Sequence, residues 1–321
     1  MNDVFKLNSL VEIDGNPKPE GLRTGVLSTR DRIRLRFAVC PSTASRTRGT
    51  IVLLQGRNES IEKYFETITD LAALGYMVAT FDWRGQGGSD RLLRDRTRGH
   101  VTSFDAYVSD LESMFRDVIL PDCRGPYALL GHSMGGAVAL MAAPRLVNRV
   151  ERIVVGAPLV ALAARSRRTG GLFYATSALG LLGLGSLPVR RGGHSAGWTA
   201  ERNPLTHDAR RFERNRALEA AAPHLFAGRP TAAWVAAATR TSRRFDESER
   251  IAEIKVPTLV VTAGADSVVS SPAAERLAWR MRSGHGLSIP GARHELMQEA
   301  DVYRAPFLAA ADAFIGGALT F

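Results

Sequence analysis

Cysteine is scarce in this sequence of 321 residues, and its scarcity argues against two kinds of architecture. The only cysteines are Cys40 and Cys123, and neither belongs to a CxxC motif or to a cysteine–histidine cluster. Structural metal sites and disulfide frameworks are recognised by such spacings. The sequence therefore predicts no metal site and no disulfide framework, and its thiols suit a reducing compartment. The first residues also lack the basic and apolar regions of a secretory signal, so we expect a cytoplasmic protein.

Lysine is scarce as well, since only four of the 42 basic residues are lysine, although the formal net charge is +10. Basic proteins often bind nucleic acid, but no motif of a nucleic-acid-binding module accompanies this charge. We therefore expect no nucleic-acid partner. Most of the excess lies in residues 159–250, which hold 15 arginines against seven acidic residues. Such a surface suits a phosphate-bearing substrate or peripheral contact with an anionic membrane, and the alternative is a solvated helical face.

Hydrophobic residues are plentiful and follow two alternating patterns. Five runs rich in aliphatic and β-branched residues predict strands: 50–54, 76–81, 126–130, 151–158 and 258–263. The continuous apolar character of the first two indicates burial. Between these runs the apolar residues recur at helical spacing. This alternation predicts the α/β class, with a mostly parallel central sheet and helices on both faces. Residues 32–39 alternate with period two, which predicts an antiparallel edge strand whose arginines face solvent.

The alternation of strands and helices stops near residue 159 and resumes near Ile251. The interrupting segment has mostly helical patterning. We therefore predict a core formed by residues 1–158 and 251–321, with residues 159–250 inserted as a helical cap.

One short motif predicts the chemistry of the protein. The sequence G-H-S-M-G at 131–135 follows a predicted strand and precedes a helix of small residues. G-x-S-x-G in this context is typical of a nucleophile elbow, where the tight backbone at the serine needs small neighbours. A serine hydroxyl is a poor nucleophile unless a base takes its proton and a carboxylate orients that base. We predict Ser133 as a catalytic nucleophile rather than an ordinary serine in a glycine-rich turn.

The base and the carboxylate are expected later in the chain, in the order serine, acid, histidine, on turns that follow strands. Asp266 lies just beyond the predicted strand 258–263, and His294 lies just beyond a last short strand that ends near Ile289. Because active sites of open α/β sheets lie at the carboxyl ends of strands, these two residues would meet Ser133. We predict that Asp266 orients His294 and that His294 accepts the serine proton.

An oxyanion hole would complete this site. In this architecture one backbone N–H comes from the residue after the nucleophile, here Met134, and another from the loop after the strand 50–54. We predict Arg57 as the second donor, with Gly56 giving the backbone room to approach the substrate; the alternative is a tight turn without this role. Each donor contributes about 3 kcal/mol in the transition state.

Together these motifs resemble the α/β-hydrolase superfamily, and more narrowly its lysophospholipase and monoacylglycerol-lipase group (serine aminopeptidase S33-like, or Hydrolase_4). The matching segments span the core: 54–57, 81–89, 131–136, 265–266 and 291–295. The cap stretch 203–208 (N-P-L-T-H-D) resembles the bacterial lysophospholipase L2-like branch. The resemblance implies a serine esterase that cleaves a lysophospholipid or monoacylglycerol-like lipid through an acyl-enzyme, without cofactor or metal. The chain departs from many lipases of the group at residue 55, where it has glutamine before Gly56 in place of histidine.

Residues 170–189 carry no charge across 20 residues, and that length is enough to cross a bilayer. A crossing there would separate Ser133 from its predicted partners, so we expect a lid over an acyl-chain pocket that dips into a membrane interface. Phe173 and Tyr174, together with Gly56, are the predicted substrate-binding residues. The alternative is a packing face between cap and core. Two other functions stay open: a hydrolase of small soluble esters, amides or C–C bonds, and a non-catalytic membrane-associated scaffold.

Overall fold

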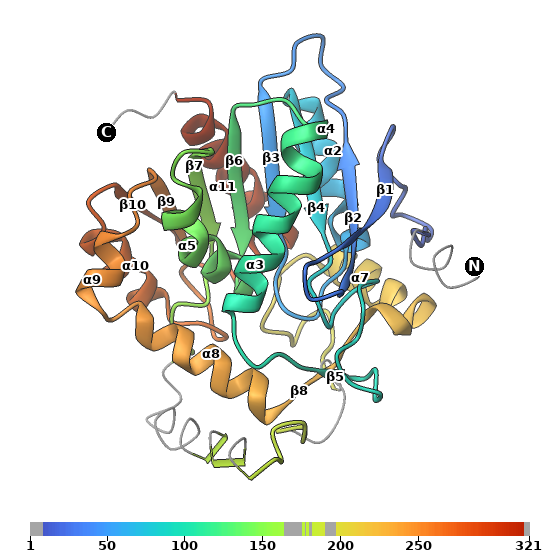
Figure 1. The fold of residues 1–321 in the computed structure, drawn as a ribbon. Helices are drawn as coiled ribbons and strands as arrows, with labels where there is room; N and C mark the ends of the chain where they lie inside the picture. The colour runs from blue at the N-terminus through green and yellow to red at the C-terminus, as the bar shows by residue number, and fades with distance from the viewer. Residues whose placement is uncertain (1–8, 164–174, 177, 180–181, 190–196, 318–321) are drawn as a thin grey trace.

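The central element of the fold is an eight-stranded sheet (Figure 1). This computed structural model describes residues 9–163, 175–176, 178–179, 182–189 and 197–317. The strand order is β1-β2-β4-β3-β6-β7-β9-β10, and all neighbours from β4 to β10 are parallel. The strands are β1 (Arg23–Ser28), β2 (Arg34–Cys40), β3 (Gly49–Leu54), β4 (Tyr76–Phe81), β6 (Tyr127–His132), β7 (Val150–Gly156), β9 (Thr258–Ala263) and β10 (Gly284–Ile289).

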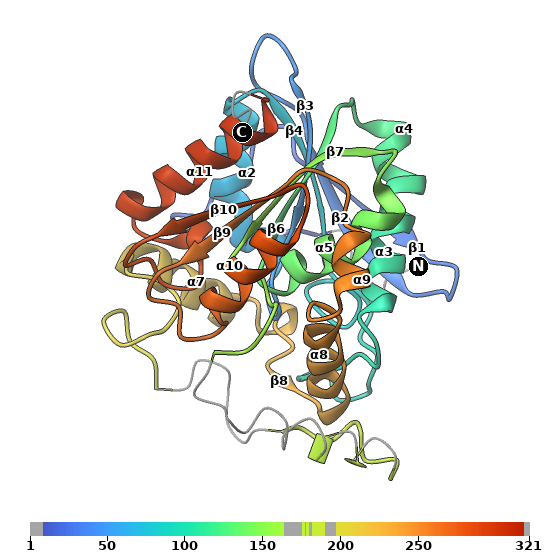
Figure 2. The same ribbon diagram turned by 90° about the vertical axis from the view of Figure 1, so that its left-hand side faces the viewer.

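Helices cover both faces of this sheet, as the alternating pattern predicted. Figure 2 shows α2 and α11 on one face and α3 and α5 on the other. Strands β3 and β9 are buried along their whole length, which explains why their sequences are continuous apolar runs. The prediction of an α/β fold with a mostly parallel sheet is therefore confirmed. The helices that accompany the sheet are η1 (Ile61–Tyr64), α2 (Phe65–Ala73), α3 (Asp105–Met114), η2 (Phe115–Ile119), α4 (Leu120–Asp122), α5 (Met134–Leu146), α10 (Ser271–Arg280), η4 (Leu296–Gln298) and α11 (Asp301–Ile315).

The prediction of an edge strand with solvated arginines at 32–39 was wrong. The strand exists as β2, but it lies between β1 and β4 and pairs antiparallel with both. Arg36 is 1% exposed, and its guanidinium forms ion pairs of 2.7 Å with Glu62 and 2.6 Å with Asp82. A buried arginine is tolerated when carboxylates compensate its charge in this way. An alternating pattern indicates which side chains of a strand lie on the same face. It does not indicate whether carboxylates from other segments, such as Glu62 and Asp82, lie against that face.

Between β7 and β9 the chain leaves the sheet and forms α7 (Ala209–Ala221), η3 (Pro223–Leu225), β8 (Arg229–Pro230), α8 (Ala232–Arg244) and α9 (Ser248–Ala252). In Figure 1 α8 and β8 lie below the sheet, at the end where the parallel strands terminate. The two-residue strand β8 pairs with β5 (Arg98–Gly99), in the connection that follows β4. The exact domain boundaries at residues 158 and 251 stay a prediction. Among the described helices, none has the length and apolar character needed to span a membrane.

Candidate active site

The turn between β6 and α5 has the tight geometry of a nucleophile elbow. Ser133 occupies it with φ 51° and ψ −113°, a left-handed backbone conformation that few residues other than glycine adopt. The neighbouring glycines are required because there is no room for a side chain at their positions. A Cβ at Gly135 would collide with the Leu54 carbonyl oxygen, and a Cβ at Gly131 would meet the backbone of Gly136. The strained turn thus presents the serine side chain beyond the end of the strand.

Asp266, His294 and Ser133 form one chain of hydrogen bonds. His294 Nε2 lies 3.0 Å from Ser133 Oγ, and His294 Nδ1 lies 2.7 Å from Asp266 Oδ2. The other oxygen of Asp266 accepts hydrogen bonds from the N–H groups of Val268 and Val269. All three side chains are buried. The structure therefore brings together the three residues that the sequence singled out, in a geometry that allows a proton to move from Ser133 to His294.

The environment of Asp266 favours its charged form. Burial alone would raise its pKa, but the hydrogen bond from His294 and the two backbone N–H donors hold the pKa below its ordinary value. An ionised carboxylate at this position would stabilise an imidazolium if His294 accepted a proton.

The predicted oxyanion loop follows β3 and lies against the start of α5. Contact between the end of β3 and Gly135 brings the loop beside Met134, the first residue of α5. The Arg57 side chain points away toward the cap, where its Nη1 donates to the Gly228 carbonyl at 2.9 Å and its guanidinium stacks on Trp234. Burial lowers the pKa of this guanidinium to about 10. The roles of the Arg57 and Met134 backbone N–H groups stay a prediction.

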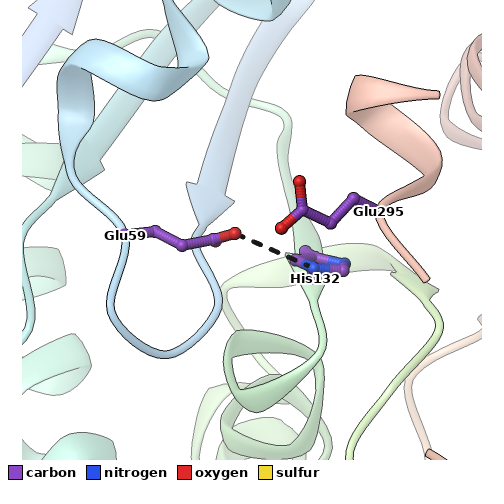
Figure 3. Close-up of side chains that lie close together, drawn as sticks. All are labelled: Glu59, His132 and Glu295. Atoms are coloured by element: carbon purple, nitrogen blue, oxygen red, sulfur yellow. Dashed lines mark ion pairs between the residues drawn. The ribbon is translucent and has the colours of Figure 1, made fainter. Parts of the chain in front are cut away.

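A cluster beside the triad has the side chains of a metal site. Figure 3 shows that Glu59, His132 and Glu295 converge from three separate segments. Their potential ligand atoms lie within 4.8 Å of one another, and the dashed line joins His132 to Glu59 at 4.0 Å. However, Lys63 Nζ lies 2.7 Å from a carboxylate oxygen of Glu59 and 2.7 Å from one of Glu295. The ammonium group thus already provides a cation for both carboxylates, which makes the cluster an ion network rather than a fitting metal site.

The two carboxylates of this network differ, because burial and the charge of Glu59 raise the pKa of Glu295, although Lys63 acts to lower it. Burial opposes ionisation of Glu59, yet Lys63 and the neighbouring donors bring its pKa down to about 2. In turn, the two carboxylates raise the pKa of Lys63 above its ordinary value, although burial acts in the opposite direction. His132 is different, because burial lowers its pKa to about 4 and keeps its ring neutral near neutral pH. This neutral ring lies 4.9 Å from the ring of His294, centroid to centroid.

The network also connects the two loops that carry the predicted chemistry. The Glu59 carboxylate accepts hydrogen bonds from the Gly56 N–H and from the Tyr64 hydroxyl. Glu295 is the residue directly after His294. Lys63 therefore links the oxyanion loop to the histidine loop. Sequence reasoning missed this link because Glu295 lies 232 positions after Lys63, although Glu59 and Lys63 are close in the chain.

A cavity of about 70 Å³ lies between this network and the cap. Its apolar walls come from cap residues that sequence reasoning did not single out: Trp198, Leu205, Phe212, Leu218 and Phe226. The only hint in the sequence was the N-P-L-T-H-D stretch at 203–208, which contributes Leu205. Of the predicted substrate-binding residues, Gly56 lies in the oxyanion loop, whereas Phe173 and Tyr174 lie outside the described residues.

The strand order, the serine elbow and the Ser–His–Asp contacts define an α/β-hydrolase. The chain belongs to the Hydrolase_4 family, described as serine aminopeptidase S33, whose model matches residues 45–301.

Proteins that are similar to this chain include two relatives by sequence and two solved structures. It is 33% identical over 268 residues to lysophospholipase L2 of Escherichia coli strain K12, covering 79% of this chain and 76% of that one. It is 26% identical to a probable lysophospholipase L2 of Haemophilus influenzae, over 92% and 93% of the two chains. A soluble variant of monoglyceride lipase from Saccharomyces cerevisiae, with a substrate analogue, matches 97% of this chain and 99% of its own (TM-score 0.74, 18% identity).

A monoacylglycerol lipase from Paleococcus ferrophilus matches 88% of this chain and 98% of its own (TM-score 0.69, 21% identity). At these identities the solved structures show the fold alone. The family match and the relatives confirm the resemblance to the lysophospholipase and monoacylglycerol-lipase group.

Proposed function

We propose that this protein is a serine hydrolase that cleaves the carboxylic ester bond of lysophospholipid or monoacylglycerol-like lipids. The observation that carries the proposal is the hydrogen-bonded chain from Asp266 through His294 to Ser133, with the serine on a strained elbow. Ester hydrolysis is also the chemistry named for the lysophospholipase relatives and the lipases of similar fold.

The proposed reaction has two halves. Ser133 attacks the ester carbonyl while His294 Nε2 takes the hydroxyl proton, and Asp266 stabilises the resulting imidazolium. The backbone N–H groups of Met134 and Arg57 hold the oxyanion. His294 then protonates the departing alcohol, which leaves an acyl group on Ser133. In the second half His294 activates water, and the fatty acid is released.

The lipid character of the substrate is proposed from the cap, taken as residues 159–250 between the two parts of the core. Four large apolar side chains in the described part of the predicted lid are solvent-exposed: Leu182, Leu184, Leu187 and Val189. Leu182 is 72% exposed, which suits contact with an acyl chain or a membrane interface. The excess of arginine over acidic residues in the cap would favour an anionic membrane surface for peripheral binding.

The test compares lipid and soluble substrates with the purified protein. We expect fatty acid release from mixed lysophospholipids and monoacylglycerols, and activity on p-nitrophenyl esters that extends to long acyl chains. Activity confined to the shortest acyl chains would instead favour a hydrolase of small soluble esters.

The nucleophile needs a separate test. A fluorophosphonate probe should label the native protein and should not label Ser133→Ala. Labelling that persisted in Ser133→Ala would exclude this serine as the nucleophile, whereas no labelling of the native protein would favour a non-catalytic scaffold.

A further inference from the structure

The cap segment 203–208 lies against the loop that carries His294, and it holds both sequence neighbours of this histidine. The N–H of Glu295 donates to the Leu205 carbonyl at 2.9 Å. On the other side of His294, Arg293 Nη1 donates to the Thr206 carbonyl at 2.7 Å. His294, the predicted catalytic base, is therefore flanked by Arg293 and Glu295, and both of these residues form hydrogen bonds with the cap.

A fully buried carboxylate strengthens this connection. Glu299 accepts hydrogen bonds from the Arg293 N–H at 2.7 Å, from the His207 N–H at 2.8 Å and from His207 Nδ1 at 2.7 Å. Burial opposes its ionisation, but the Arg293 and His207 donors keep the pKa of Glu299 below its ordinary value. One side chain thus joins the residue before His294 to the cap segment, and it does so as an ion.

The cap segment has a shape fixed by its own side chains. The Asn203 side-chain oxygen accepts from the N–H groups of Leu205 and Thr206, each at 2.9 Å. The Thr206 hydroxyl donates at 2.8 Å to the carbonyl of Gln298, which lies in η4, directly after the histidine loop in the chain. Both Asn203 and Thr206 are buried, so water does not compete for these bonds. The segment therefore offers its carbonyl groups in a fixed arrangement.

We infer that residues 203–208 and Glu299 form a clamp that sets the position of His294 relative to Ser133. This inference rests on the proposed function. In it, Thr206 and Glu299 are positioning residues, because they are bonded to residues on either side of His294, namely Arg293 and Gln298. A displacement of the cap segment would then also displace His294. A displacement of about 1 Å in a reacting group can cost about a hundredfold in rate, so a loosened clamp would reduce turnover.

The test separates positioning from substrate binding by using p-nitrophenyl acetate, a short ester with no acyl chain to engage the cap. In Glu299→Gln an amide NH2 group replaces one of the two carboxylate oxygens. This group cannot accept a hydrogen bond, so it would face the N–H of Arg293 or of His207 and repel it. In Thr206→Val the hydroxyl that reaches Gln298 is lost. For both variants we expect kcat to fall about tenfold to a hundredfold with little change in KM. The rate of fluorophosphonate labelling should fall in parallel.

A matched control and a milder variant complete the design. Thr239→Val removes a hydroxyl that donates only to the Val235 carbonyl within α8, and its kcat should equal the native value. If Glu299→Gln fails to fold, Arg293→Met keeps the carboxylate and removes only the bond to the Thr206 carbonyl, and kcat should still fall.

The results distinguish the clamp from the proposed function. If Ser133→Ala keeps its activity, the proposed function fails. If Ser133→Ala is inactive and the clamp variants keep native kcat, or raise KM alone, the clamp is refuted and the proposed function stands.

Discussion

Replacement of Lys63 by methionine tests the buried ion network most directly. The substitution keeps the length and the apolar stem of the side chain and removes the ammonium group that lies 2.7 Å from both Glu59 and Glu295. Two buried carboxylates would then lack their shared cation. We expect a large loss in the free energy of unfolding, because an uncompensated buried charge is one of the few changes that cost more than an ordinary core substitution.

The size of the loss follows from the charge state of Glu59. Its pKa lies at about 2 in the folded protein against an ordinary value of 4.5, although burial alone would raise it. Glu59 therefore contributes stability that is present above pH 4.5 and is lost as the pH falls toward 2. Loss of one partner of a buried ion pair costs about 3–5 kcal/mol in general. We therefore expect Lys63→Met to lose about 3–5 kcal/mol at neutral pH.

The effect should depend on pH with a definite sign. Without the ammonium group, burial raises the pKa of Glu59 above 4.5, and the folded protein then prefers the protonated carboxyl. Stability of the variant is consequently retained at low pH and lost as the pH rises through the new pKa. The difference between native protein and variant should be smaller near pH 4.5 than at neutral pH.

Urea unfolding followed by tryptophan fluorescence measures these differences. Lys255→Met is the matched control, since Lys255 is exposed, and it should change stability by less than about 0.5 kcal/mol. Adding Glu295→Gln to Lys63→Met removes one of the two stranded charges and should restore at least about 1 kcal/mol. A loss below about 1 kcal/mol in Lys63→Met, equal at both pH values, would refute the assignment of the network.

Three further predictions concern the site itself. Asp266→Asn should fold normally but lower kcat by about ten-thousandfold, because an amide neither orients His294 nor stabilises its charged form; a kcat near the native value would exclude Asp266 as the orienting acid. Gly135→Ala should destabilise the protein by about 1–3 kcal/mol and abolish probe labelling, since the added methyl group collides with the Leu54 carbonyl; native stability and labelling would contradict this. The native protein should lose stability between pH 6.5 and 4, because the pKa of His132 falls from 6.5 unfolded to about 4 folded. His132→Gln should flatten this part of a stability–pH curve measured by urea unfolding, and an unchanged slope would argue against a buried neutral histidine.

The sequence predicted those parts of the site that depend on order along the chain. Ser133 was predicted from five consecutive residues, and Asp266 and His294 were predicted from their places directly after two strands. Such signals are local, and the parallel sheet brings strand ends together. The structure brings these three side chains within hydrogen-bond distance, and their catalytic roles stay a prediction. The same logic predicted the sheet itself, because buried parallel strands leave continuous apolar runs such as β3 and β9.

The parts that could not be predicted depend on partners far apart in the chain. Lys63 and Glu295 are 232 positions apart, and neither residue carries a pattern that indicates the other. Arg36 was assigned to solvent because its strand alternates, although Glu62 and Asp82 compensate its charge inside the protein. The helical character of the cap could be predicted from spacing. Two of its contacts with the histidine loop, however, are accepted by the backbone carbonyl groups of Leu205 and Thr206, which leave no trace in the composition.

The hydrogen bonds that join Arg57 and Asn58 to Gly228 have a consequence for protein engineering. Arg57 donates to the Gly228 carbonyl and the Asn58 side chain accepts from the Gly228 N–H, so both bonds end on one residue in the cap. Gly228 has a φ of +64°, a conformation that most replacement residues would not adopt readily. A chimera that exchanges this cap for that of a relative must therefore keep the local backbone at residue 228. Otherwise the new cap would alter the conformation of the loop after β3, although the sequence of the core itself had not been changed.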